Sequence, residues 1–265
     1  MKNQTLICGD CLTVLPTLEA ESVDLILTDL PYGTTGNKWD SIIPLDALWR
    51  EWRRVSKPRA VVVLTATQPF TSVLVMSNLK QFKYDWTWCK EKGTGHLNAK
   101  RQPLRDKEDV LVFHDGQSKY NPQWGRGVPY NGNKRIGSLQ QTSSYGVYGK
   151  SREDSDGRRY PRQVLQFHGV GRGGIHPTQK PVALFEYLIK TYTDEGDVVL
   201  DCTSGVGTTA IAALRSRRRS VCIEQDQDYH QEAMKRLHSE YQEFTAEIGE
   251  PQGLPLPKVE FSSTK

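Results

Sequence analysis

The stretch Asp197-Val198-Val199-Leu200-Asp201-Cys202-Thr203-Ser204-Gly205-Val206-Gly207-Thr208-Thr209 decides the fold. Its apolar start, 197–201, predicts a buried strand, and a helix is expected to begin at Thr208. The glycines between them allow a tight turn and a close approach of the backbone to a ligand. The next predicted strand, 220–223, ends at Glu224, whose carboxylate can bind both ribose hydroxyls of a nucleoside. The stretch therefore predicts a Rossmann-like site for an adenosine-containing cofactor.

The loop alone does not identify the cofactor. Gly205 to Ala210 fits G-x-G-x-x-A, and Glu224 follows at dinucleotide-like spacing, so a nicotinamide-dependent oxidoreductase is a genuine alternative. No lysine precedes Thr208 or Thr209, which excludes a P-loop. A Gly-rich turn without a ligand is a third interpretation, and the strand–loop–helix–strand context argues against it.

Outward from this stretch, apolar strands alternate with amphipathic helices. The predicted strands are 5–8, 22–28, 60–65, 84–88, 109–113 and 164–167, with a turn at 57–59, and the predicted helices include 45–55, 69–79, 182–193 and 227–242. Nearly continuous apolar strands joined by helices are typical of a buried parallel sheet. We therefore predict an α/β fold with a doubly wound, mostly parallel sheet.

The charge of the chain is unevenly distributed. The 265 residues carry a net charge of +4, but residues 90–180 hold 17 Lys and Arg against 8 Asp and Glu, and the flanks are acidic. Regular periodicity is also lost from about 114 to 163. A basic insert in an acidic protein suggests a polyanionic partner, although a solvated loop region with a Lys/Arg bias would look the same.

The cysteines and the apolar runs limit the class of protein. Five cysteines are an odd number, and most lie in apolar runs, which indicates reduced thiols and a cytoplasmic location. Cys8 and Cys11 have no second Cys pair or nearby His, so we predict no metal site. No run is long enough for a membrane span, and no membrane partner is expected.

The tetrapeptide Asp29-Leu30-Pro31-Tyr32 follows the predicted strand 22–28, at the same edge of the sheet as the glycine loop. An exocyclic amino group on a base is a poor nucleophile because its lone pair is delocalised into the ring. Two acceptors for its hydrogens, the Asp29 carboxylate and the Leu30 carbonyl, would make the nitrogen more nucleophilic. Tyr32 could stack on a base that has left the duplex. The alternative is a strand-ending turn whose Asp caps a helix and whose Tyr packs.

These motifs resemble those of the β-ordered DNA amino-methyltransferases, which act on adenine N6 or cytosine N4. Residues 29–32 resemble D-P-P-Y, residues 201–209 resemble D-P-F-x-G-x-G-T-T, and His176 to Pro181 resembles the segment before that loop, all in the family's order. The chain departs from the pattern at Leu30, which replaces the first Pro, and at Cys202-Thr203, which replace Pro-Phe.

The resemblance implies a seven-stranded methyltransferase sheet in a domain covering 1–245. A target-recognition insert would occupy about 90–163, with a loop at 93–100 over the active site, and residues 246–265 would form a flexible tail. S-adenosylmethionine would be the cofactor, and double-stranded DNA the partner. A homodimer, a cognate restriction nuclease and a prokaryotic or phage origin are also compatible with the resemblance.

The resemblance also implies roles for individual residues. Asp29, Leu30, Pro31 and Tyr32 would orient the target base. Asp10 would bind the cofactor adenine, Thr178 and Lys180 the methionine carboxylate, and Glu224 the ribose hydroxyls. The loop would hold the methionine and ribose through Asp201, Thr203, Ser204, Gly205, Gly207 and Thr208. Methyl transfer would be direct, without a covalent enzyme intermediate.

The function expected from these features is site-specific methylation of adenine N6 in DNA, with the base flipped out of the helix. Cytosine N4 is the nearest alternative, although cytosine-N4 enzymes of this family often carry Ser where this chain has Asp29. Two alternatives from other classes stay open. One is an NAD(P)-dependent oxidoreductase, and the other is a non-catalytic DNA-binding protein with a vestigial cofactor site.

Overall fold

The computed structural model describes residues 4–33, 40–130, 140–142, 146–148, 156–170, 179–248 and 259–262. The strands of the main sheet are β1 (Gln4–Cys8), β2 (Val23–Thr28), β3 (Ser56–Ala66), β4 (Phe82–Thr94), β5 (Arg105–His114), β10 (Val164–Gln166), β11 (Val198–Asp201), β12 (Arg219–Glu224) and β13 (Val259–Ser262). The helices are α1 (Cys11–Val14), α2 (Leu45–Val55), α3 (Phe70–Ser77), α4 (Val182–Tyr192), α5 (Thr208–Arg215) and α6 (Gln227–Ile248), with short 3₁₀ turns η1 (Leu15–Thr17) and η2 (His96–Asn98).

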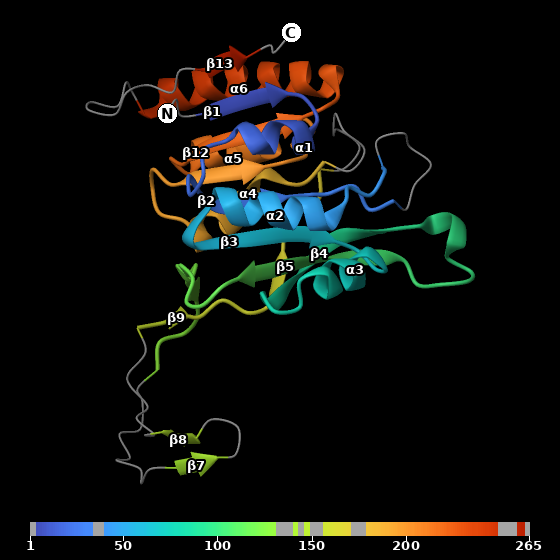
Figure 1. Ribbon diagram of the computed structural model, residues 1–265. Helices are drawn as coiled ribbons and strands as arrows, with labels where there is room; N and C mark the ends of the chain where they lie inside the picture. Colours follow the sequence, from blue (N-terminus) through green and yellow to red (C-terminus); the bar gives the residue numbers. More distant parts are fainter. Residues whose placement is uncertain are drawn as a thin grey trace. The chain divides into compact units, whose positions relative to one another are not determined.

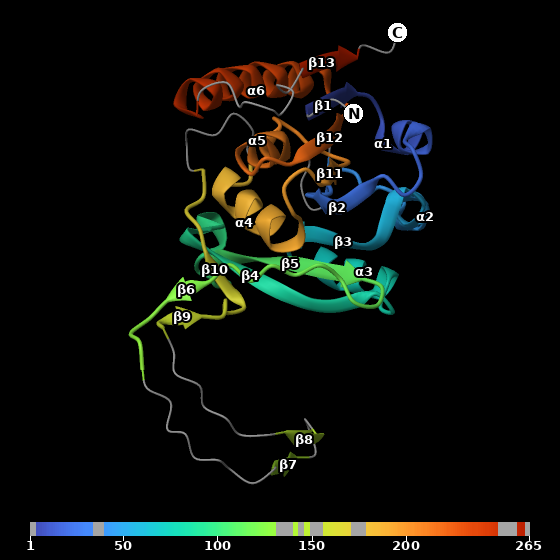
Figure 2. The same cartoon turned by 90° about the vertical axis from the view of Figure 1, so that its left-hand side faces the viewer.

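The sheet lies between two layers of helices, as Figures 1 and 2 show. Helices α1, α2 and α3 cover one face, and α4, α5 and α6 cover the other. Alternate residues of each strand supply the two cores: Ile26 packs with Trp49 and Trp52 of α2, whereas Leu25 and Leu27 pack toward α4. Each buried strand is therefore apolar on both faces, which confirms the predicted doubly wound α/β fold.

The strand order is β10-β4-β5-β3-β2-β11-β12-β1-β13. β5 runs antiparallel to both of its neighbours, and the other pairings in this sheet are parallel. The expected seven strands form the centre of the sheet, and the described residues add a short strand at each edge. One of these edge strands, β13, pairs with β1. In the tail expected over 246–265, the described residues are the end of α6, up to Ile248, and the edge strand β13, and the other tail residues lie outside the described ranges.

Two further expectations are corrected by backbone pairing. The predicted turn at 57–59 lies within β3, where the register against β2 shifts and Arg59 adopts a φ of 76°. A β-bulge accommodates these residues without ending the strand. The expected loop at 93–100 is the tip of the β4–β5 hairpin, since Thr94 pairs with Arg105 and η2 follows. The hairpin extends beyond the neighbouring strands in Figure 1.

The chain divides into two compact units. One contains residues 1–121 and 163–265, and the other contains Pro122–Arg162. The second unit is smaller than the insert expected at about 90–163, because residues up to Asn121 belong to the first unit, in which β4 and β5 pair within the main sheet. It contains the paired strands β6 (Gly125–Arg126) and β9 (Arg158–Arg159), and the paired strands β7 (Gln140–Thr142) and β8 (Gly146–Tyr148). In the described ranges, no helix is long and apolar enough to cross a membrane.

Candidate active site

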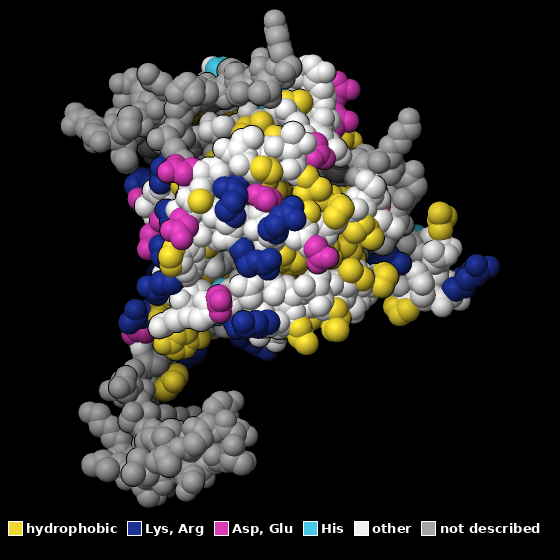
Figure 3. Space-filling model, viewed as in Figure 1, with side chains coloured by type: hydrophobic (Ala, Val, Ile, Leu, Met, Phe, Trp, Pro, Cys, Tyr) yellow, Lys and Arg dark blue, Asp and Glu magenta, His cyan; other side chains and the backbone are white. Residues whose placement is uncertain are grey.

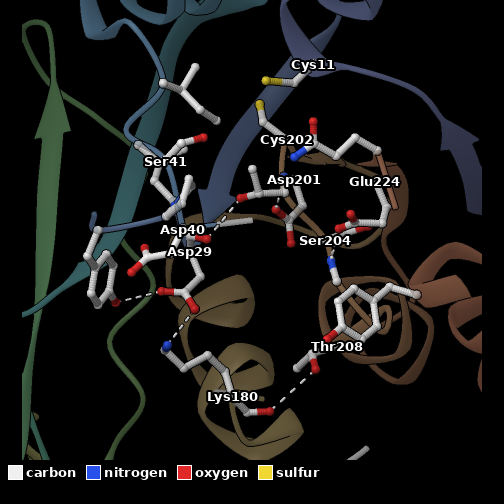
Figure 4. Close-up of a pocket in the computed structure, with 18 of the residues that line it drawn as sticks. Cys11, Asp29, Asp40, Ser41, Lys180, Asp201, Cys202, Ser204, Thr208 and Glu224 are labelled. Atoms are coloured by element: carbon white, nitrogen blue, oxygen red, sulfur yellow. Dashed lines mark hydrogen bonds and ion pairs between the residues drawn. The ribbon is translucent and has the colours of Figure 1, made fainter. Parts of the chain in front are cut away.

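A cavity of about 360 Å³ lies at the carboxyl ends of the central parallel strands. β1 leads into Asp10, β2 into Asp29, β11 ends at Asp201 and β12 ends at Glu224, and all four carboxylates line the cavity. Figure 4 shows that Asp29, Asp201 and Glu224 are arranged around it. In an open parallel sheet, ligands bind at this edge because consecutive loops diverge there to opposite faces. The sequence prediction that both motifs meet at one edge is therefore confirmed.

Asp29 is held by three side-chain donors. Its Oδ1 accepts hydrogen bonds from the Tyr32 hydroxyl, at 2.7 Å, and from the Thr65 hydroxyl. Its Oδ2 accepts one from the Lys180 ammonium, at 2.5 Å (Figure 4). A carboxylate offers about four acceptor positions, so about one position on Oδ2 is left for a ligand. The arrangement fixes the carboxylate and keeps one acceptor position available.

The rest of the catalytic loop is anchored by packing. Leu30 is buried in the core with α2 and α3, so a leucine side chain replaces proline as the anchor of this loop. The Tyr32 ring lies 5.4 Å from the Phe70 ring. Burial, followed by the charge of Asp29, raises the pKa of the Tyr32 phenol well above its ordinary value, so the hydroxyl remains a proton donor. Pro31 lines the cavity beside them.

The glycine loop is held by Asp201. This side chain is 3% exposed and accepts hydrogen bonds from the hydroxyls of Thr28 and Thr209 and from the Thr203 backbone N–H. Burial raises the pKa of its carboxyl to about 6, against the effect of these donors. Thr203 also donates to the Asp29 carbonyl at 3.0 Å, so a hydroxyl connects the two loops.

The two glycines of the loop have different surroundings. A Cβ at Gly205 would meet no atom within 4 Å, and this residue lines the cavity. A Cβ at Gly207 would lie 2.9 Å from the Ala233 Cβ on α6, and the φ of Gly207 is 78°. Gly205 therefore leaves room for a ligand, whereas Gly207 allows α6 to approach and lies outside the cavity lining.

The remaining predicted cofactor residues lie around the same cavity, with one exception. Glu224 accepts from the Gly205 N–H at 2.7 Å and the Asp226 N–H at 2.8 Å, and burial raises the pKa of its carboxyl. Asp10 caps α1 by accepting from the Thr13 N–H at 3.1 Å. Ser204 and Thr208 line the cavity, whereas Thr178 lies outside the described residues. The open face of the glycine loop and the nearby carboxylates fit an adenosyl cofactor.

Lys180 lines the cavity, and its ammonium pairs with Asp29 at 2.5 Å. Its predicted role toward the cofactor methionine carboxylate stays a prediction. Its second carboxylate neighbour, Glu108, was missed by the sequence analysis. Glu108 reaches this edge of the sheet because β5 is antiparallel, so the start of β5 lies beside the end of β3. Strand direction is not encoded in apolar periodicity, and no local signal identified this residue.

Other residues missed by the sequence analysis line the cavity or support its loops. Thr65, near the end of β3, donates a hydrogen bond to Asp29, and Phe185 on α4 is a buried cavity residue. The Trp52 indole N–H lies 3.2 Å from the Cys202 sulfur, beneath the loop position where the family pattern has proline. Ile42, Ile43 and Tyr229 add apolar and aromatic surface. An amphipathic pattern could identify Phe185 and Trp52 as buried, but not as neighbours of the site.

The fold and the cavity together define a Rossmann-like methyltransferase. The family model described as DNA methylase matches residues 23–235, and the chain belongs to this family. It is therefore a DNA amino-methyltransferase of the adenine-N6/cytosine-N4 group, and its cofactor is S-adenosylmethionine.

Relatives and solved structures agree with this assignment. The type II methyltransferase M.HpaI of Haemophilus parainfluenzae is 28% identical over 257 residues, covering 91% of this chain and 76% of the relative. The DNA adenine methyltransferase YhdJ of Escherichia coli is 27% identical, covering 88% of this chain and 82% of the relative. The M1.HpyAVI complex with S-adenosylmethionine has a TM-score of 0.60 at 22% identity, covering 88% of this chain and 98% of that one. The cytosine-N4-specific PvuII methyltransferase has a TM-score of 0.64 at 15% identity, covering 93% and 94%.

Proposed function

We propose that this protein methylates the N6 amino group of adenine at specific sites in double-stranded DNA. The observation that carries the proposal is Asp29, a carboxylate with one acceptor position directed into the cavity that contains the glycine loop. An aspartate at this position favours adenine within the family, in which cytosine-N4 enzymes often have serine there. The name of the relative YhdJ, a DNA adenine methyltransferase, also supports adenine.

The residues of the cavity have separate tasks in the proposed reaction. Asp29 and the Leu30 carbonyl accept the two hydrogens of the target amine, which directs the nitrogen lone pair toward the methyl group. S-adenosylmethionine would supply that methyl group on a positively charged sulfur: the bond from sulfur to methyl breaks as the bond to nitrogen forms, S-adenosylhomocysteine leaves, and the methylated amine releases a proton to solvent. Glu224 binds the ribose hydroxyls, Asp10 the adenine of the cofactor, and the backbone around Gly205 the methionine part. Because positioning and polarisation of the amine supply the rate, transfer requires no covalent enzyme intermediate.

The depth of the site supports the proposal that the target base is flipped out of the helix. Asp29 has a side chain only 21% exposed, and it lies among Tyr32, Thr65 and Lys180 at the end of β2. An amino group inside a stacked duplex cannot reach such a buried carboxylate, so the target base has to leave the helix. Tyr32 lies beside Asp29 and is the residue we assign to stacking on the extruded base. Replacement of the target by 2-aminopurine should therefore give a fluorescence increase on binding.

The unit Pro122–Arg162 is proposed to contribute to DNA recognition. Arg158 lies over the Trp124 ring at 5.3 Å, and Trp124 lies 4.3 Å from Tyr160. Arg159 lies over the Tyr130 ring at 4.9 Å. Exposed rings beside guanidinium groups suit contacts with bases and phosphates. Elsewhere, the described Lys and Arg side chains are interspersed with Asp and Glu on the face seen in Figure 3.

The test is nucleoside mass spectrometry of DNA from a host that lacks adenine and cytosine methylation. Expression of the wild-type protein should produce N6-methyladenine, and expression of Asp29→Asn should not. N4-methylcytosine would move the assignment to the other base of the family. Neither modified base, in cells with folded protein that binds S-adenosylmethionine, would contradict DNA methylation by this chain.

A restriction-modification role is a further part of the proposal. M.HpaI and the relative M1.MboII are both named type II methyltransferases. We propose that this chain likewise protects DNA from a cognate nuclease and acts in the cytoplasm of a prokaryotic host. Sequencing that detects the modified base would define the recognition site, and a nuclease cutting that site only in unmodified DNA would identify the partner. A homodimer remains a prediction, which sedimentation of the purified protein would test.

A further inference from the structure

Four charged side chains form a continuous chain from the catalytic loop to β4. The Lys180 ammonium lies 2.5 Å from Asp29 Oδ2 and 3.4 Å from Glu108 Oε2. The other oxygen of Glu108 pairs with Lys90. Negative and positive charges alternate along this chain, so its net charge is zero. Such an arrangement orients each member more strictly than an isolated pair would.

The middle of the chain is deeply buried. The side chains of Lys180 and Glu108 are 6% and 9% exposed. Burial opposes the charge on Lys180, but the carboxylates of Asp29 and Glu108 outweigh it and raise the pKa of the ammonium above the ordinary lysine value. Lys180 is therefore a permanent cation within the site. Removing either partner of a buried pair leaves an uncompensated charge, so both carboxylates matter for its position.

Glu108 is a buried carboxylate in the cavity, and the contacts of the other site residues do not explain why it is there. Its Oε2 is inaccessible to solvent and has no hydrogen-bond partner among the described residues, yet Glu108 lines the cavity. The Lys180 ammonium, at 3.4 Å, is its charged neighbour. A buried carboxylate oxygen without a neighbouring cation would be costly, so the Lys180 ammonium is the group that compensates the charge of Glu108 at this oxygen.

We propose that Lys180 and Glu108 are positioning residues for Asp29. Lys180 holds Oδ2 from one direction and leaves the remaining acceptor position for the amine of the target base, while Glu108 keeps the ammonium in place. This inference rests on the proposed function, because Asp29 must have an amine to orient. It differs from the role that the family resemblance implies, in which Lys180 binds the methionine carboxylate of the cofactor.

The backbone of Lys180 supports this assignment. Its carbonyl lies 3.4 Å from the Thr208 hydroxyl at the start of α5, so the main chain is fixed beside the glycine loop. From there the side chain extends to the other loop (Figure 4). Lys180 therefore contacts both sides of the cavity: its backbone contacts Thr208 on the cofactor side, and its ammonium contacts Asp29 on the catalytic side. Its loss should impair methyl transfer and leave most of the cofactor contacts intact.

The test separates cofactor binding from transfer. Lys180→Met, Lys180→Arg and Glu108→Gln would be compared with Lys190→Met, a control that removes a lysine paired with Glu186 at 3.1 Å outside the cavity. Calorimetry gives the Kd for S-adenosylmethionine, and single-turnover assays at saturating cofactor and DNA give the transfer rate. Lys180→Met should slow transfer about 100-fold and Glu108→Gln about tenfold, with Kd changed by less than about threefold. Lys180→Arg should retain more activity than Lys180→Met, and Lys190→Met should match wild type.

A different pattern would overturn the inference. If Lys180→Met weakens cofactor binding tenfold or more and regains the wild-type rate at saturating cofactor, Lys180 binds the methionine carboxylate. If Lys180→Met does not fold, Glu108→Gln decides, and a full transfer rate in that variant excludes the positioning role. Failure of the proposed function is distinguishable, because it would show as wild-type protein that leaves the target amine unmodified.

Discussion

Two aspartates at the ends of neighbouring parallel strands have different surroundings in this protein. Asp29 follows β2 and Asp201 ends β11, and the two strands pair directly. Asp29 faces the cavity and contacts a lysine, whereas Asp201 is 3% exposed and accepts hydrogen bonds from threonines and a backbone N–H. Among the described residues, Asp201 has no ion pair. Two residues of the same type, at equivalent positions in the fold, therefore have different tasks.

The difference bears on the proposed catalytic role of Asp29. Both aspartates lie at the carboxyl edge of the sheet and line the cavity, so this position alone does not assign the role. A cation lies beside Asp29 and stabilises its charge in a half-buried site. Among the described residues Asp201 has no such cation, and its donors hold the glycine loop in shape. We therefore expect substitutions at Asp29 to affect the reaction, and substitutions at Asp201 to affect the fold.

The largest expected effect is that of Asp29→Asn on methyl transfer. The amide presents one acceptor oxygen instead of two, so the acceptor for the target amine is lost or misplaced. We expect the single-turnover rate to fall about 10³-fold, and the free energy of unfolding to fall by about 1–3 kcal/mol, because the buried Lys180 ammonium loses one of its two carboxylate neighbours. Rates on DNA and urea unfolding would measure the two quantities. A variant with nearly wild-type rates would remove Asp29 from the catalytic machinery.

The second prediction concerns Asp201→Asn and the pH dependence of stability. The pKa of Asp201 is raised from 3.8 to about 6 by burial. A raised pKa means that the native state prefers the protonated form. This contribution to stability is fully present below about pH 4 and is lost as the pH rises through 6. At about 1.4 kcal/mol for each pKa unit, it amounts to about 3 kcal/mol.

Urea unfolding of wild type and Asp201→Asn between pH 4 and 7.5 would test this prediction. The asparagine does not titrate, so the wild type should lose about 3 kcal/mol relative to the variant across the range. The comparison uses the change with pH, so a constant destabilisation by the substitution does not affect it. If the free energies of unfolding of wild type and Asp201→Asn change in parallel with pH, Asp201 has the same pKa in the folded and unfolded states. The contrast between a buried Asp201 and a cation-paired Asp29 would then be weaker.

The sequence predicted both aspartates as site residues, and the family resemblance gave Asp29 a catalytic role and Asp201 a role in the cofactor loop. Each follows a buried apolar run, and such runs fix strand identity, so the fold and the edge that carries the site were predictable. Helix α2 was predicted at its observed bounds because Trp49, Trp52 and Val55 recur on one helical face. Apolar periodicity therefore determined the layers of this fold.

Some partners of the two aspartates were not predictable, because they come from distant parts of the chain. Lys180 is 151 residues from Asp29, and Thr28 is 173 residues from Asp201. Glu108 depends on the antiparallel direction of β5, which apolar periodicity does not encode. The electrostatic environment of a site depends on such tertiary neighbours, whereas its location depends on local patterns. The role proposed here for Lys180 rests on such tertiary neighbours and differs from the role that the resemblance implies.

A third carboxylate at a strand end extends the comparison to cofactor binding. Glu224 ends β12 and accepts two backbone N–H groups, one on each oxygen, which leaves one acceptor position on each for a ribose hydroxyl. Glu224→Gln should weaken binding of S-adenosylmethionine about tenfold, whereas Asp29→Asn should leave that Kd nearly unchanged. Calorimetry of both variants would test the separation of tasks.

The pH dependence of cofactor binding gives a second readout for Glu224. Burial raises the pKa of this carboxyl, so protonation begins above the usual range for glutamate. The charged form is the better acceptor for hydroxyls, and affinity should therefore fall as the pH is lowered toward that raised pKa. The Glu224→Gln variant should lack this dependence. A wild-type Kd that is constant with pH would mean that the ribose is bound elsewhere.

The smallest expected effect is at Thr203, which joins the two aspartates. Its hydroxyl donates to the Asp29 carbonyl at 3.0 Å and lies 2.9 Å from the Thr28 hydroxyl, which itself donates to Asp201. Thr203→Val keeps the shape and removes the hydrogen bond, so we expect about 1 kcal/mol less stability and a rate about fivefold lower. Thr203→Ser should restore both.

Comparing the change in rate with the change in stability in Thr203→Val tests whether Asp29 and Asp201 act independently. If the rate falls more than about 100-fold while stability is unchanged, the hydroxyl transmits the position of the glycine loop to Asp29, and the two residues form one catalytic unit. If stability falls and the rate does not, the bridge only supports the fold. The family pattern has phenylalanine at position 203. In that case the Thr203 hydroxyl would stabilise the loop by hydrogen bonding, whereas the aromatic side chain would stabilise it by packing.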